Sequence, residues 1–315
     1  MSNQTTTTAI WGDVHANINA LEAFWEMFEE QPEIGHWFLG DAVGYGHKPQ
    51  EVLDKLASEI RPTYALRGNH DAALLYLKWN YDIPGTVYFP TREWNDAAVS
   101  TIRRHYNSLD NGYLEYLRDL GQIRLRLPAP RDYIFLAHGR YGPNDHASLL
   151  TYVDKYQTLE VDYVNNRDWG EAARAGRFVL TIYGHTHEPQ FCCRPANKPS
   201  DHLGRAWEYL PLPFEQPVVL EPGYVYHLNP GSLGFPKRED TQGNTRPSGQ
   251  PDGRYWPTYA VLTEKLVKES DEGEEKIESA QVQMYQLIYN VEQARQDMRE
   301  AGYPPEVLGW LGGEA

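Results

Sequence analysis

Short apolar runs alternate with amphipathic stretches at the start of the chain. The runs TTAIW, HWFLG and TYALRG, at residues 7–11, 36–40 and 63–68, are typical of buried strands. The two intervening stretches, residues 16–30 and 49–60, place their large apolar residues at helical spacing. This alternation of strands and helices predicts an α/β fold whose first strands pair in parallel.

The pattern changes twice in the remainder of the chain. Residues 72–120 have a mainly helical pattern, and strand-like apolar runs follow them. The predicted later strands are residues 122–127, 132–139, 177–184, 224–232 and 257–263. The acidic run at 269–279 is expected to form a solvated hairpin turn between two of the last strands, and helices are expected at about 290–312.

The stretch from Phe235 to Trp256 consists mainly of glycine, proline and polar residues. Because it lacks the apolar side chains needed to pack it down, the sequence predicts a long mobile loop. Because it follows the NPGS motif at 229–232, we expect this loop to lie near the functional site. We interpret residues 1–315 as a single domain with a helical insertion at about 72–120, this loop at about 235–256 and C-terminal helices at about 290–312.

Composition and charge narrow the possible partners. The net charge of −15 disfavours binding to extended nucleic acid, which relies on lysine and arginine to neutralise phosphates. No apolar run reaches the ~18 residues that would indicate a membrane span, and the N-terminus lacks a signal-peptide pattern. The adjacent Cys192 and Cys193 suit free thiols in a reducing cytoplasm, with a thiol metal site as the alternative. We therefore predict a cytoplasmic protein that does not cross a membrane.

Polar side chains that can bind metals follow five of the predicted strands. In chain order they are Asp13 and His15, Asp41, Asn69 and His70, His138, and His185 and His187. Strand ends in an open α/β sheet converge on one edge, which is where ligands bind in such folds. Carboxylates can hold two cations close together, and imidazoles suit several transition metals, so the set predicts a site for a pair of divalent ions.

Simpler explanations exist for each residue taken alone. The histidine pair in GHTH could belong to a solvated loop. Asp13 or His15 could cap the helix that follows, and Asp41 could cap a loop. The combination of all these motifs, each behind a predicted strand, favours the metal site.

The motifs GDVH, GDAVGYG, RGNHD, AHG and GHTH together resemble those of the calcineurin-like metallophosphoesterases. NPGSLG at 229–234 and the C-terminal segment resemble the small bacterial branch of that superfamily. The resemblance implies a four-layer α/β/β/α sandwich of two mixed sheets flanked by helices. It also implies two divalent metal ions, for which manganese, iron, zinc, nickel and cobalt are candidates.

The resemblance assigns the metal ligands residue by residue. It implies that Asp13, His15 and His187 hold the first metal, that Asp41 bridges both metals, and that Asn69, His138 and His185 hold the second. Two metals about 3.5–4 Å apart lower the pKa of a bridging water and neutralise the charge that develops on a phosphate. The implied reaction is therefore hydrolysis of a phosphoester by a bridging hydroxide.

Three further residues are candidates for contact with the substrate. By resemblance His70 stabilises or protonates the leaving oxygen, with a structural hydrogen bond as the alternative. Arg67 matches a position that contacts phosphate in some relatives, and a surface salt bridge is the alternative. Tyr45 is a candidate wall of the substrate pocket. We interpret the remaining histidines as structural: His36, His47, His105, His146, His202 and His227.

The substrate class is predicted from a departure from the family pattern. Protein serine/threonine phosphatases of the superfamily carry GDxVDRG, and here Gly44 and Tyr45 replace that aspartate and arginine. The loss of a guanidinium favours a phosphodiester of a small or nucleotide-like substrate over a phosphomonoester dianion. The alternatives are a phosphomonoesterase or protein phosphatase that uses the same site, and a scaffold protein that has lost catalysis. The charge disfavours a DNA nuclease, and the sequence leaves the oligomeric state open.

Overall fold

A computed structural model describes most of the chain. The described residues are 3–79, 89–90, 94–142, 146–150, 153, 156–200, 203–214, 216–236, 256–268 and 275–311. Except for its ends, the predicted loop between Phe235 and Trp256 lies outside the described residues, so its predicted mobility and position stay predictions.

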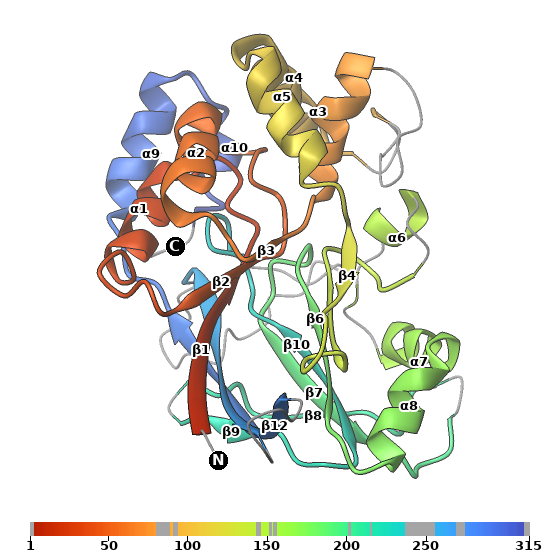
Figure 1. Ribbon diagram of the computed structural model, residues 1–315. Coiled ribbons are helices and arrows are strands. Elements are labelled where there is room, and N and C mark those ends of the chain that lie inside the picture. Colours follow the sequence, from red (N-terminus) through yellow and green to blue (C-terminus); the bar gives the residue numbers. More distant parts are fainter. Residues whose placement is uncertain are drawn as a thin grey trace.

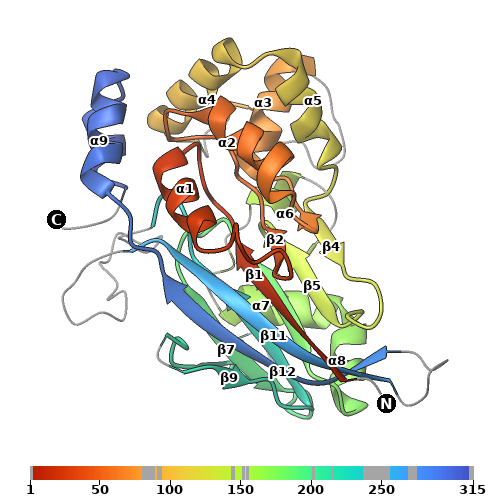
Figure 2. The same cartoon turned by 60° about the vertical axis from the view of Figure 1, so that its left-hand side comes forward.

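Sheet A contains the strands predicted at the start of the chain. Its order is β3 (Tyr64–Ala65), β2 (Gly35–Phe38), β1 (Asn3–Trp11), β11 (Thr258–Lys268), β12 (Glu275–Gln286) and β9 (Val218–Val219). The pairs β1–β2 and β2–β3 are parallel, as predicted, whereas β11 runs antiparallel to β1 and to β12 (Figure 2). Sheet A is therefore mixed.

Sheet B contains most of the strands from the middle of the chain. Its order is β4 (Arg124–Arg126), β5 (Ile134–Ala137), β6 (Val179–Tyr183), β10 (Tyr224–Asn229), β7 (Gln190–Pro195) and β8 (Glu208–Tyr209). The central strands β5, β6 and β10 pair in parallel, and the outer pairs are antiparallel. Every residue of β5 and β6 is buried, as expected for strands that are covered on both faces.

Helices cover the outer face of each sheet (Figure 1). The helices that share a core with sheet A are α1 (Ile18–Glu26), α2 (Pro49–Lys55), α3 (Asn69–Trp79), α4 (Asp96–Ser108), α5 (Asn111–Asp119), α9 (Val291–Glu300) and α10 (Pro305–Leu308), with a π-helical turn at Leu56–Ile60. On the outer face of sheet B lie α7 (Tyr156–Asn165) and α8 (Arg167–Arg174). The short helix α6 (His146–Leu150) lies apart from these two, and its Leu150 packs against the core of sheet A and its helices. None of the described helices combines the length and the apolar character needed to span a bilayer.

The alternation of side chains along β1 builds two cores. Ala9 and Trp11 point into the core under the helices, where the ring of Trp11 lies 4.9 Å from that of Phe24 on α1. Ile10 points the other way, into the core that sheet A shares with sheet B. The four-layer α/β/β/α sandwich of two mixed sheets is thus confirmed. That residues 1–315 form one domain stays a prediction.

Some elements differ from the sequence prediction. Residues 275–279, predicted as part of a turn, belong to β12, because lysines of β11 face their acidic side chains; Lys268 Nζ lies 3.3 Å from Glu275 Oε1. No element was expected at 146–174, where α6, α7 and α8 lie. Helix α8 buries only Trp169, Gly170 and Ala173, which is too short an apolar stripe to be a signal in the sequence.

Candidate metal centre

The predicted ligands lie at the ends of strands from both sheets. Asp13 and His15 follow β1, Asp41 follows β2, and Asn69 opens α3 after β3 in sheet A. His138 follows β5, and His185 and His187 follow β6 in sheet B. The expectation of convergence at the edge of a single sheet is therefore refined: loops after the strands of both sheets come together, as the bonds of His138 to Leu39 and of His185 to Asp13 show, and each sheet contributes about half of the candidate ligands.

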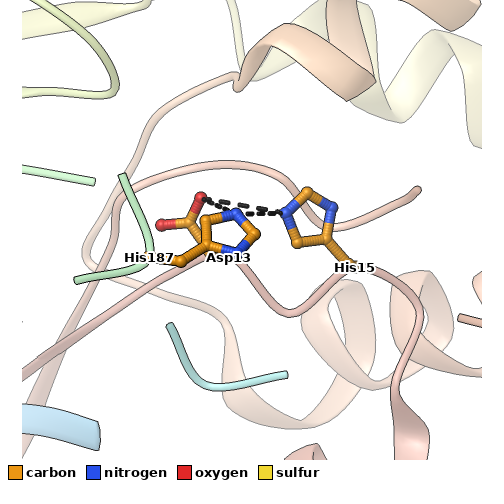
Figure 3. Close-up of side chains that lie close together, drawn as sticks. All are labelled: Asp13, His15 and His187. Carbon is orange, nitrogen blue, oxygen red and sulfur yellow. Dashed lines mark hydrogen bonds and ion pairs between the residues drawn. The ribbon is translucent and has the colours of Figure 1, made fainter. Parts of the chain in front are cut away.

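Asp13, His15 and His187 form one group (Figure 3). The Nε2 atoms of His15 and His187 lie 2.9 Å apart. Oδ1 of Asp13 lies 3.3 Å from Nε2 of His187 and 3.9 Å from Nε2 of His15. One carboxylate and two imidazoles therefore face a common point, as three ligands of one metal ion would.

Asp41, His138 and His185 form a second group. Oδ2 of Asp41 lies 3.4 Å from Nε2 of His138, and Oδ1 of Asn69 lies 2.9 Å from the same nitrogen. All four residues are buried. The second group thus contains the same residues that the family resemblance assigns to the second metal.

Asp41 lies between the two groups. Its Oδ2 atom is 3.5 Å from Nε2 of His15 as well as 3.4 Å from Nε2 of His138. Its Oδ1 atom accepts a hydrogen bond from the backbone N–H of His70 at 2.8 Å, which fixes the carboxylate plane. A carboxylate held in this place can serve both groups at once.

Backbone carbonyls determine which ring nitrogen of three histidines faces the centre. Nδ1 of His15 donates to the carbonyl of Val43 at 3.0 Å, and Nδ1 of His138 donates to that of Leu39 at 2.8 Å. Nδ1 of His187 donates in the same way to the carbonyl of Phe235 at 2.6 Å. Each bond leaves Nε2 as the atom that can bind a metal, which is how histidine ligands are usually oriented.

His185 is held in the opposite orientation. Its Nε2 atom donates to the carbonyl of Leu150 at 3.3 Å, which leaves Nδ1 as the nitrogen that can bind a metal. Its backbone N–H donates to both carboxylate oxygens of Asp13, at 3.2 and 3.1 Å. One residue therefore ties the second group to a ligand of the first.

Unusual backbone conformations concentrate in the same loops. Of the seven described non-glycine residues with positive φ, five are predicted ligands: Asp13 (51°), His15 (50°), Asp41 (58°), His185 (65°) and His187 (60°). Left-handed conformations are unfavourable for such residues and persist mainly where the surroundings impose them, often at functional sites. The backbone thus marks these loops independently of the motif match.

Asp71 organises the loop that carries Asp41, a role that the sequence analysis missed. Its carboxylate accepts hydrogen bonds from the backbone N–H groups of Asp41 at 2.9 Å, Val43 at 3.1 Å and Gly68 at 3.0 Å. Burial and the nearby Asp41 carboxylate raise the pKa of Asp71 to about 7. The only sequence signal was its place directly after His70 in RGNHD.

The NPGSLG segment joins the loops of the two sheets. Asn229 donates to the carbonyl of Gly184 and to Oγ1 of Thr186, both at 2.9 Å, and so holds the GHTH loop. Ser232 donates to the carbonyl of Asp13 at 2.8 Å and accepts from the backbone N–H of Phe235 at 2.8 Å. The segment therefore holds the backbone of the loops that carry Asp13 and His187.

The electrostatics of the centre favour a bound cation. Burial alone would raise the pKa of Asp41, but the surrounding imidazoles, that of His138 foremost, lower it well below its usual range. Burial opposes a charge on His138, yet the Asp41 carboxylate outweighs it and raises the pKa of His138 to about 9. The pocket thus stabilises positive charge beside Asp41.

The residues present fit divalent metal ions. With Nδ1 of His15 and His187 both protonated, two nitrogen lone pairs face each other at 2.9 Å beside a carboxylate oxygen. A shared cation stabilises such an arrangement. Burial also lowers the pKa values of His15 and His185 well below the usual range, so these rings are neutral, as metal binding requires.

His70 lies beside the first group and forms a third cluster of possible ligands with His15 and Asp41. Its ring centroid is 4.6 Å from that of His15 and 4.7 Å from that of Tyr45. Burial lowers the pKa of His70 to about 4, so the ring is neutral at pH 7. Its Nδ1 atom is buried without a hydrogen-bond partner in the described part of the chain, which does not support the alternative of a structural hydrogen bond through that atom.

Arg67 is buried, so the alternative of a surface salt bridge is wrong. Its Nη1 atom donates to the carbonyl of Arg118 at 3.3 Å, and burial lowers its pKa. Among the histidines interpreted as structural, His36, His47, His105 and His227 lie outside both ligand groups, His146 begins α6, and His202 is outside the described residues. Cys192 and Cys193 are free and buried.

The fold and these residues define a class of protein: an α/β sandwich with a buried carboxylate–imidazole centre between its two sheets. The family model described as calcineurin-like phosphoesterase matches residues 6–189, which is more than half of the chain. The chain belongs to the calcineurin-like phosphoesterase family.

Solved structures agree with this fold. A metallophosphoesterase from Sphaerobacter thermophilus is 22% identical with a TM-score of 0.61, and the alignment covers 98% of each chain. A hypothetical protein from Pyrococcus horikoshii OT3 is 18% identical with a TM-score of 0.58, over 98% of this chain and 100% of the other. No curated protein matches the sequence.

Proposed function

We propose that the protein is a dinuclear, metal-dependent phosphoesterase that hydrolyses a small phosphodiester. The observation that supports it most is the pair of ligand groups on either side of Asp41, whose Oδ2 lies 3.5 Å from His15 and 3.4 Å from His138. In this proposal Asp13, His15 and His187 hold one metal, and Asn69, His138 and His185 hold the other. Manganese, iron, zinc, nickel and cobalt remain the candidate ions.

In the proposed reaction the metals and the side chains have different roles. Two bound divalent ions neutralise charge on a phosphate and lower the pKa of a coordinated water. Asp41 and Asp13 hold them, and backbone carbonyls fix the histidine rings so that no rearrangement is needed during the reaction. His70 is proposed to donate a hydrogen bond or a proton to the leaving oxygen. A neutral imidazole can still donate from one ring nitrogen.

The preference for a diester rests on the loop between Gly44 and Gly46. Gly44 and Tyr45 stand where protein phosphatases of the superfamily have an aspartate and an arginine. The ring of Tyr45 lies 4.8 Å from that of His15 and 4.7 Å from that of His70. An aromatic wall without a guanidinium suits the monoanion of a small, nucleotide-like diester better than a phosphomonoester dianion. Arg67, on the loop that follows β3, is proposed as a phosphate contact.

A comparison of substrates tests this proposal. We expect kcat/KM in Mn²⁺ to be higher for bis(4-nitrophenyl) phosphate than for 4-nitrophenyl phosphate or a phosphopeptide. Preference for the monoester or the phosphopeptide would favour a phosphomonoesterase or a protein phosphatase on the same site. Metal binding without hydrolysis of any of the three would favour a scaffold. If Arg67 contacts phosphate, Arg67→Met should raise KM, whereas an unchanged KM would remove it from the site.

We also propose that the protein is cytoplasmic, on the basis of its two cysteines. Both cysteines are free, and burial raises their pKa values, so neither is poised to form a disulfide or to bind a metal as a thiolate. Free thiols are consistent with a cytoplasmic protein.

A further inference from the structure

His70 is oriented without the carboxylate that the family pattern would provide. The corresponding position is Gly44, and Nδ1 of His70 has no hydrogen-bond partner among the described residues. Gly44 itself lies directly against the ring. A Cβ atom at this position would come within 2.6 Å of Nδ1 of His70 and 2.5 Å of Nδ1 of His15. The backbone of Gly44 therefore forms one wall for both imidazoles.

An imidazole from helix α4 holds that wall. Nδ1 of His105 accepts a hydrogen bond from the backbone N–H of Gly44 at 3.3 Å. Its Nε2 atom, which then carries the proton, donates to the carbonyl of Gly46 at 2.8 Å. The side chain is buried, and the hydroxyl of Tyr303 lies 3.2 Å from the same Nε2 atom. One ring thus clamps both ends of the Gly44–Gly46 turn.

The two imidazoles that touch Gly44 differ in their other restraints. His15 is fixed by its bond to the carbonyl of Val43, and Asp71 holds Val43 through its N–H. That restraint does not pass through His105. The Nδ1 atom of His70 has no such bond, and its ring is held by packing against Gly44, Tyr45 and Trp94, whose ring centroid lies 5.1 Å away. Movement of the turn should therefore displace His70 more than His15.

We propose that His105 is a positioning residue for His70. It acts through the backbone of Gly44 and takes over the orienting role of the absent carboxylate. The inference rests on the proposed function, in which His70 assists departure of the leaving oxygen. It predicts that the loss of His105 impairs the step that depends on His70 and leaves the metal centre intact.

Three substitutions separate the two hydrogen bonds of His105. His105→Asn keeps an acceptor near the position of Nδ1 and so keeps the bond to Gly44. His105→Gln keeps a donor near the position of Nε2 and so keeps the bond to Gly46. His105→Leu keeps neither. If His105 acts through Gly44, His105→Asn should retain more activity than His105→Gln, and His105→Leu should be the least active.

The measurement is kcat for phosphodiesters with good and poor leaving groups, together with metal content. For an alkyl leaving group, His105→Leu should lower kcat by roughly 10- to 100-fold, since a misplacement of about 1 Å can cost up to 100-fold. For a 4-nitrophenolate leaving group, which needs no proton, the loss should be much smaller. Metal content and KM should stay unchanged. Equal losses for both leaving groups, or loss of metal, would overturn the proposal.

Two further variants make the result specific. The double variant His70→Asn/His105→Leu should be no slower than His70→Asn alone, because both act on one step. His227 is a matched control: it is fully buried, and its Nε2 atom is hydrogen-bonded to Gln190 at 3.0 Å. His227→Leu should lower stability without changing the dependence on the leaving group. Additive losses in the double variant would contradict the positioning role.

The same data distinguish failure of this inference from failure of the proposed function. If His70→Asn shows a loss that depends on the leaving group and His105→Leu does not, only the role of His105 is wrong. If the wild-type protein with metal hydrolyses none of the esters, the proposed function is wrong.

Discussion

The ligand histidines on the sheet loops and His70, at the start of α3 in the helical layer above sheet A, are held in different ways. Between the sheets, His15, His138 and His187 each donate from Nδ1 to a backbone carbonyl. In the helical layer, His70 is held by packing, and its buried Nδ1 has no hydrogen-bond partner among the described residues. A metal ligand must keep one tautomer and one position, whereas a group that assists a leaving oxygen must be free to exchange a proton. The two kinds of support match these two needs.

The backbone shows the same difference. The sheet loops hold five predicted ligands in left-handed conformations, namely Asp13, His15, Asp41, His185 and His187, whereas His70 lies in the first turn of the regular helix α3. Strain in the loops is retained where several hydrogen bonds converge, such as those from Asp71 and Ser232. The ligand loops are therefore the rigid region, and the position of His70 depends on its neighbours.

The largest effect is expected where the two ligand groups meet. Asp41→Asn removes charge from the carboxylate that faces both groups. It should weaken the binding of both metals and lower activity by more than the roughly 100-fold that is typical of losing an outer-shell partner. Metal content and kcat measure this. Glu160→Gln is a matched control, because Glu160 is a buried carboxylate paired with Arg194 outside the centre. Loss of only one metal would show that Asp41 does not bridge.

The next largest effect should come from the helical layer. His70→Asn should leave metal content intact and lower turnover by roughly 10²–10⁴-fold, the usual contribution of a positioned proton donor. The loss should shrink for esters with good leaving groups. If the two regions were supported and used alike, His70→Asn would instead release metal.

His36 on β2, a buried histidine outside the metal centre, should affect stability but not catalysis. Burial among aromatic rings lowers the pKa of His36 to about 4. The folded-state pKa of His36 is then below the unfolded value of about 6.5, so the unfolded protein takes up a proton first as the pH falls. The stability that the neutral, buried His36 contributes is therefore fully present above pH ~6.5 and is lost as the pH falls to about 4. The loss is about 3 kcal/mol at 1.36 kcal/mol per pKa unit. Urea unfolding across this pH range should show that the free energy of unfolding falls more steeply for the wild type than for His36→Leu. Parallel declines in the two proteins would contradict this role of His36.

The smallest effect is expected for Asn229, which supports the GHTH loop through hydrogen bonds. Asn229→Ala removes the bonds to Gly184 and Thr186 and should weaken metal binding by about 10- to 100-fold. Asn290→Ala is a matched control, because Asn290 caps α9 through Gln293. It should lower stability by about 1 kcal/mol without changing metal affinity. Equal effects of the two variants on metal affinity would show that the GHTH loop needs no support from Asn229.

The sequence predicted the parts of the centre that follow a strand. Asp13, Asp41 and His138 stand directly behind apolar runs, and β1, β2 and β5 form where those runs predict them. Their convergence follows from the topology, since the carboxyl ends of parallel strands share an edge. The division of the ligands between two metals came from the family resemblance and stays a prediction.

The supporting residues could not be predicted in the same way. Ser232 reaches the carbonyl of Asp13 across 219 positions of sequence, and His105 reaches Gly46 across 59. Both bonds end on backbone atoms, which carry no residue-specific signal. Strand β7 and helix α8 were missed because each buries few large apolar residues at a clear period.

Titration of metal-free protein with Mn²⁺ tests the central claim most directly. Protein stripped by a chelator should not hydrolyse bis(4-nitrophenyl) phosphate. Activity should return as Mn²⁺ is added and should level off at two ions per chain, with the bound metal measured in the same samples. Full activity of the stripped protein, or full activity at one ion per chain, would contradict a dinuclear centre built around Asp41.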